Sequence, residues 1–69
     1  MKLTLLAKDI QSGKQGCLSV YLDAEGWLVI QGDLLDPATQ SNLLNVLPGE
    51  GAVRIRPEIV REALARLLG

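Results

Sequence analysis

Few side chains in this sequence could do covalent chemistry, and the cysteine is the first of them. Cys17 is the one thiol among 69 residues, and the chain contains no histidine. Without histidine, a cysteine nucleophile would have to be activated by a lysine, an arginine or a helix N-terminus. One cysteine also excludes an intramolecular disulfide and leaves no ligand set typical of zinc. We interpret Cys17 as a core or half-buried strand thiol and expect no catalytic residue, no metal site and no cofactor.

Two acids on either side of a leucine pair are the second candidate for chemistry. Asp33 and Asp36 could bind a cation or transfer protons if their carboxylates converged. No further ligand or base accompanies them, so we interpret Asp36 as a helix cap and Asp33 as a solvated loop acid. The glycines do not form a phosphate-binding motif either. The chain is therefore not expected to be an enzyme.

Binding is the alternative to catalysis, and four side chains are candidates for it. Trp27 could anchor a protein partner, because tryptophan is enriched at interface hot spots; the alternative is an ordinary half-buried strand aromatic. Arg54, Arg56 and Arg61 could contact DNA phosphates if they shared one surface. The net charge of −1 makes a nucleic-acid partner less favoured than a protein, although it does not exclude one.

The composition points to self-association. Apolar residues make up 48% of the chain, with no phenylalanine, and the mean hydropathy is +0.22. A chain this short buries only about 60% of its unfolded surface, so it usually needs a disulfide, a metal or a partner subunit. We therefore predict a homodimer. No segment is long and apolar enough to span a bilayer or to serve as a signal peptide, so a cytoplasmic location away from membranes is expected.

These candidate residues must be positioned by short elements within one domain, 1–69. Alternating or β-branched apolar residues predict strands over Lys2 to Ala7, Cys17 to Leu22 and Trp27 to Gln31. Asp23 to Gly26 predicts a hairpin turn between the last two. A further half-buried strand is predicted over Gly51 to Arg56, with the arginines on one face.

Two helices complete the predicted order βββαβα. Asp36 and Pro37 indicate the start of a short helix that carries Leu43, Leu44 and Leu47 and ends at Pro48-Gly49. Pro57 opens the second helix, whose apolar stripe is Ile59, Val60, Ala63, Leu64, Leu67 and Leu68. The pattern predicts an α+β domain in which a small, largely antiparallel sheet is packed by this C-terminal amphipathic helix.

Two resemblances bear on function. The segments Trp27 to Gly32, Asp36-Pro37, Leu47 to Glu50 and Val53 to Pro57 follow one another as in a group of small, mostly uncharacterised actinobacterial proteins that includes developmental regulators. This resemblance, over residues 27–60, implies a homo-oligomeric accessory factor that acts beside a transcription regulator through protein contacts, without catalytic residues.

The second resemblance lies in the C-terminal third of the chain. The segment Ala52 to Leu64 is similar to the strand-to-helix piece of swapped-hairpin antitoxins and transition-state regulators. It implies the alternative function, a DNA-binding antitoxin-like regulator. The leading expectation is a non-enzymatic protein-interaction module.

Overall fold

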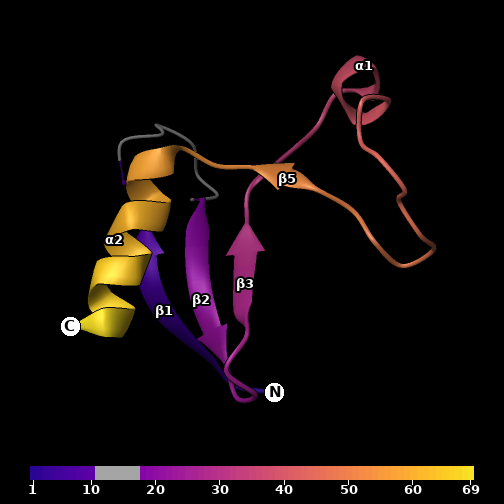
Figure 1. The fold of residues 1–69 in the computed structure, drawn as a ribbon. Helices are drawn as coiled ribbons and strands as arrows, with labels where there is room; N and C mark the ends of the chain where they lie inside the picture. The colour runs from indigo at the N-terminus through magenta and orange to yellow at the C-terminus, as the bar shows by residue number, and fades with distance from the viewer. Residues whose placement is uncertain (11–17) are drawn as a thin grey trace.

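The computed structural model describes residues 1–10 and 18–69, and Figure 1 shows its ribbon. The elements follow in the order β1 (Leu3–Lys8), β2 (Ser19–Asp23), β3 (Leu28–Gln31), β4 (Asp33–Leu34), α1 (Pro37–Gln40), β5 (Val53–Arg54) and α2 (Pro57–Leu68). The predicted α+β class, element order and C-terminal helix are confirmed. The structure adds one short strand, β4, which the sequence pattern did not indicate.

The main sheet contains β1, β2 and β3 in that order, and its strands are antiparallel. On the central strand Val20 lies opposite Ala7 on one side and Ile30 on the other, so these three side chains share a face. The β1 register shifts between Leu5 and Ala7. This irregularity inserts an extra residue and increases the local twist of the outer strand β1.

The predicted turn between β2 and β3 is confirmed. Gly26 adopts a φ of 89°, a conformation that glycine reaches without steric penalty. The Asp23 N–H donates to the Trp27 carbonyl at 2.9 Å, and the Asp23 carboxylate accepts the N–H groups of Glu25 and Trp27 at 2.8 and 2.9 Å. A three-residue loop with its last residue in the left-handed region is a standard hairpin connection.

The core lies between α2 and the adjoining face of β1 and β2 (Figure 1). It consists of Leu6, Ala7, Val20, Ile59 and Ala63, all buried, with Leu22 and Ile55 packed at its margin. The predicted helix is confirmed, and it begins at Pro57 because proline lacks an N–H that would have no partner in the first turn. The far part of its apolar stripe is not covered: Leu64, Leu67 and Leu68 are exposed.

Residues 33–54 form a projection that we call the arm. Its base is the pairing of β4 with β5, in which Asp33 lies opposite Arg54 and Leu34 opposite Val53. Figure 1 shows the arm, including α1, extending away from the sheet and from α2. The predicted strand 51–56 is therefore shorter than expected, and only its continuation at Ile55 packs against the core.

The first predicted helix starts where expected and ends much earlier. Asp36 caps it, since its carboxylate accepts the Thr39 N–H at 2.7 Å, but α1 ends at Gln40 instead of reaching Leu47. The predicted apolar stripe of Leu43, Leu44 and Leu47 therefore does not exist as a helical face. This part of the prediction is wrong.

Polar side chains explain the early end of α1. The Ser41 hydroxyl and the Asn42 amide both donate to the Ala38 carbonyl, at 2.7 and 3.3 Å. Such side chains compete with backbone N–H groups for the carbonyls that a helix needs. Asn45 then adopts a φ of 56°, which a right-handed helix cannot include.

Candidate functional site

The most constrained polar contact joins the start of α2 to the end of β1. Arg56 donates from Nε to Asp9 Oδ2 at 2.8 Å and from Nη2 to Asp9 Oδ1 at 2.9 Å. The Asp9 side chain is 1% exposed, and that of Arg56 is 44% exposed. Glu58 lies 3.6 Å from Nη1 of the same guanidinium. Arg56 thus neutralises an acid inside the protein.

This contact also acts on the ionisation of Arg56. The hydrogen bonds to Asp9 raise the pKa of the guanidinium above its ordinary value, and the charges of Asp9, Glu58 and Glu62 act in the same direction, whereas desolvation opposes them. Arg56 is therefore a permanent cation held between carboxylates. A phosphate would have to compete with both Asp9 and Glu58 for it.

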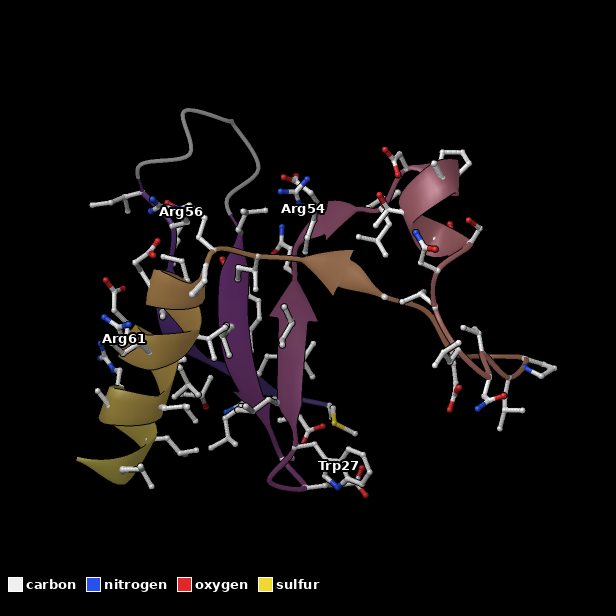
Figure 2. The ribbon with its side chains drawn as sticks, turned by 45° about the horizontal axis from the view of Figure 1, so that its top comes forward. Trp27, Arg54, Arg56 and Arg61 are labelled. Carbon is white, nitrogen blue, oxygen red and sulfur yellow. The ribbon has the colours of Figure 1, made fainter. Side chains whose placement is uncertain are left out.

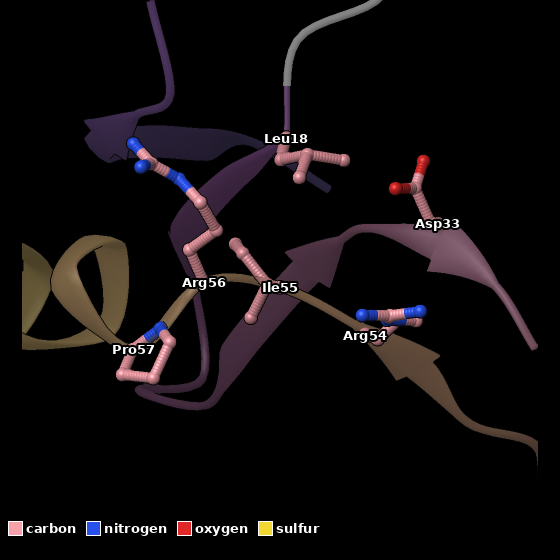
Figure 3. A pocket seen from close by; sticks show the side chains of 6 residues that line it. All are labelled: Leu18, Asp33, Arg54, Ile55, Arg56 and Pro57. Atoms are coloured by element: carbon pink, nitrogen blue, oxygen red, sulfur yellow. The ribbon is translucent and has the colours of Figure 1, made fainter. Parts of the chain in front are cut away.

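Arg54 lies two residues earlier, on β5, where it faces Asp33 across the β4–β5 pair. Figure 3 shows both side chains at the rim of a hollow of 190 Å³. The hollow is lined by Leu18, Asp33, Arg54, Ile55, Arg56 and Pro57. It is smaller than the roughly 300–1,000 Å³ of typical small-molecule sites, and it mixes charges of both signs. The residues that line the hollow therefore favour no one class of ligand among anions, cations and organic molecules.

The structure does not gather the three predicted arginines into one free cationic surface. Figure 2 places Arg54 at the base of the arm, Arg56 at the strand-to-helix connection and Arg61 on α2. The middle one of the three is held by Asp9. Arg61 is exposed on α2, as the amphipathic pattern predicts for its position.

Trp27 lies at the opposite end of the sheet from Arg54 and Arg56 (Figure 2). It directly precedes β3 and is 74% exposed, so it is not the half-buried strand aromatic that was the alternative interpretation. Its backbone N–H is fixed by the Asp23 carboxylate. The role of Trp27 as an interface anchor stays a prediction.

The most exposed apolar side chains of the arm are not among the binding residues predicted from the sequence. Leu34 is 84%, Leu44 87% and Leu47 62% exposed. Helical spacing assigns Leu44 and Leu47 to the apolar set of a predicted helix, and neither is among the predicted interaction residues. The signal that identifies them is the pair Ser41 and Asn42, because both residue types favour ends of helices over interiors.

Three further features concern Cys17, metal binding and membrane-spanning helices. Cys17 lies outside the described residues. Within residues 1–10 and 18–69, no group of three or more cysteine, aspartate or glutamate side chains could hold a metal ion. In the same part of the chain, every helix is too short or too polar to cross a membrane.

Comparison with known proteins adds no relative: no protein-family model, curated protein or solved structure matches the chain. The two resemblances, the homodimer and the cytoplasmic location therefore stay predictions.

Proposed function

We propose that this protein is a non-enzymatic interaction module that binds a partner protein through the apolar side chains of its arm. The observation that carries the proposal is the exposure of Leu34, Leu44 and Leu47 on a projection that the body of the protein does not cover. Burying a leucine side chain contributes about 1.5–3 kcal/mol, so such residues supply binding free energy when a partner covers them.

Hydrogen bonds order the arm, which has few buried side chains. The Leu47 N–H donates to the Glu50 carboxylate at 3.0 Å, and the Glu50 N–H donates back to the Leu47 carbonyl at 3.0 Å. Asp36 caps α1 at the other side of the arm. A segment that is already ordered loses less conformational entropy on binding, which favours affinity.

The charge of the arm indicates the chemistry of its partner. Residues 33–54 contain three acids, Asp33, Asp36 and Glu50, and one basic residue, Arg54 at the base. A complementary surface is therefore apolar with basic groups at its rim. The resemblance of residues 27–60 to accessory factors supports a transcription regulator as the partner, bound by protein contact.

The alternative, a DNA-binding antitoxin-like regulator, has less support from the geometry. It needs Arg54, Arg56 and Arg61 directed at phosphates, but the Arg56 guanidinium is engaged by Asp9 and Glu58. The three acids of the arm would also repel a nucleic acid near Arg54.

The test compares two leucines with nearly the same exposure. A photo-crosslinking amino acid at position 44, used in the source cells, identifies the protein that contacts the arm, and calorimetry then measures its affinity for the purified chain. Leu44→Ser should weaken binding about ten- to hundredfold, since a leucine is no longer buried at the interface. Leu68→Ser should leave the affinity unchanged, because Leu68 is 83% exposed at the end of α2, whereas Leu44 is 87% exposed on the arm.

Three outcomes would overturn the proposal. The first is equal loss of affinity in both variants. The second is cross-linking at position 44 to no other protein. The third is salt-dependent binding of duplex DNA that persists in Leu44→Ser and is lost in the Arg54→Ala, Arg61→Ala double variant, which would support the regulator that binds DNA.

A further inference from the structure

A second surface, separate from the arm, lies at the outer edge of the main sheet. β3 pairs with β2 on one side, and no strand of the described part of the chain pairs with its other side (Figure 1). Such an edge presents backbone donors and acceptors to any strand that approaches it.

The backbone groups on this edge follow from the hairpin. The Asp23 N–H donates to the Trp27 carbonyl, which makes these two residues a hydrogen-bonded pair. Hydrogen-bonded and non-hydrogen-bonded pairs alternate along antiparallel strands, so Tyr21 and Val29 form the next hydrogen-bonded pair. The N–H and carbonyl groups of Leu28 and Ile30 consequently point away from β2, toward the open edge.

The side chains of β3 leave this edge unprotected. Leu28, Val29 and Ile30 are uncharged and apolar, with 39%, 37% and 41% exposure. Proteins usually protect edge strands with a lysine, a proline or a bulge. β1, the other outer strand, has two of these devices, a register irregularity and Lys8, and β3 has none of them.

The total surface area of the chain leaves room for a subunit interface. The protein exposes 5600 Å². A compact monomer of its mass exposes about 4,200 Å² by the usual scaling. The excess exceeds the roughly 800 Å² that each partner buries in an interface of standard size. Because an antiparallel edge is complementary to itself, a second copy of this chain can be accommodated at β3 while the arm remains free.

We propose that β3 pairs antiparallel with β3 of a second copy, so that the two three-stranded sheets become one continuous sheet. The two-fold axis passes between the two Val29 residues. Leu28 of each copy then exchanges backbone hydrogen bonds with Ile30 of the other, and apolar side chains meet apolar side chains on both faces. Trp27 comes opposite Gln31 of the second copy, which gives the exposed indole a contact surface.

The test places a charge at the two-fold axis and the same charge at a matched control position. Val29, Tyr21 and Leu5 form one cross-strand row on the face away from α2, and Leu5 is 44% exposed on the opposite edge. Val29→Lys brings two like charges together, so the dimer dissociation constant should rise about tenfold or more. Leu5→Lys adds the same charge to the same face and should leave the dimer intact. Sedimentation velocity over a concentration series measures both.

Mixing oppositely charged variants tests the register. The Val29→Lys and Val29→Glu variants should each form only a weak homodimer. When they are combined, they should form a heterodimer, because opposite charges then face each other across the axis. This rescue also shows that both variants are folded.

Hydrogen exchange of the unsubstituted protein supplies an independent readout: the Leu28 and Ile30 amides should be protected at high concentration and exchange quickly on dilution.

This inference would be overturned if the unsubstituted chain sedimented as a monomer at all concentrations. It would also be overturned if Val29→Lys did not weaken the dimer, or if Leu5→Lys weakened it equally. Exchange of the Leu28 and Ile30 amides that did not depend on concentration would contradict it as well. The inference does not rest on the proposed function of the arm, because Leu44→Ser leaves β3 unchanged. Failure of one therefore leaves the other standing.

Discussion

The Arg56 guanidinium donates two hydrogen bonds to the Asp9 carboxylate, although 47 positions separate the two residues in the sequence. Asp9 directly follows β1, and Arg56 directly precedes α2. A two-point contact between arginine and a carboxylate fixes orientation as well as distance. The pair therefore sets how the start of the helix meets the end of the sheet, at the margin of the small core.

The unequal burial of the two partners predicts unequal effects of removing them. Arg56→Ala takes the guanidinium from a carboxylate that is 1% exposed, whereas Asp9→Asn leaves a guanidinium that water reaches. The loss of one partner of a buried polar group lowers the free energy of unfolding by about 1–3 kcal/mol, and by more when the group is charged. Urea denaturation should give Arg56→Ala the larger loss in the free energy of unfolding. An equal or larger loss in Asp9→Asn would contradict this account.

The same pair shows what sequence patterns cannot predict. Alternation, helical spacing and turn residues are local, so they correctly indicated β1, the hairpin at Gly26 and the helix that begins at Pro57. No local pattern joins Asp9 to Arg56. The sequence therefore indicates Arg56 as a candidate for phosphate contact, whereas in the fold its guanidinium neutralises Asp9.

The arm contains two further features that local sequence patterns could not predict, the end of α1 and the strand β4. The cap at Asp36 is a local signal and was predicted, but the end of α1 depends on Ser41 and Asn42 side chains that compete for a carbonyl. β4 is two residues long and exists because it meets β5 from a distant part of the chain. Leucine spacing alone could not distinguish a buried helical stripe from an exposed loop.

Burial along α2 predicts which of its apolar residues stabilise the fold. Ile59 is 3% exposed against the sheet, and Leu68 is 83% exposed. Ile59→Ala should lower the free energy of unfolding by about 2–5 kcal/mol, since it removes buried methyl groups and leaves a cavity. Leu68→Ala should change it by less than about 0.5 kcal/mol. Chemical denaturation monitored by circular dichroism measures both, and similar effects of the two substitutions would show that α2 does not pack as described.

Gly32 predicts a steric effect at the base of the arm. A Cβ at this position would lie 2.6 Å from the Arg54 carbonyl oxygen, and the backbone of β5 would have to move. Gly32→Ala should therefore destabilise the protein by about 1–3 kcal/mol, as overpacking does. Hydrogen exchange should become faster at the amides of the β4–β5 pair before it changes in the main sheet.

Gly51 is the matched control for this substitution. A Cβ there meets no atom within 4 Å, and its φ is not in the left-handed region. Gly51→Ala should be neutral or stabilise the protein by up to about 1 kcal/mol, because alanine restricts the unfolded chain. Equal destabilisation by both substitutions would argue against the close approach of Gly32 to β5.

Asp36 predicts how the arm responds to acid. Hydrogen bonds from the Thr39 side chain and then from its backbone N–H, with a smaller effect of Arg54, lower the pKa of Asp36 below its ordinary value of 3.8, against a small opposing effect of desolvation. A lowered pKa in the folded state means that the cap stabilises α1 fully above the ordinary value. This stabilisation is lost as the pH falls through the folded value.

The Thr39 amide reports this titration directly. Its nuclear magnetic resonance shift should follow the protonation of Asp36, with a midpoint below 3.8. Asp36→Asn should abolish the titration and keep the helix start, because asparagine also caps helices, whereas Asp36→Ala should abolish both. A Thr39 amide that titrates at or above the ordinary aspartate value would mean that the capping bond does not persist in solution, and the arm would then lack one of the contacts that keep it ordered for a partner.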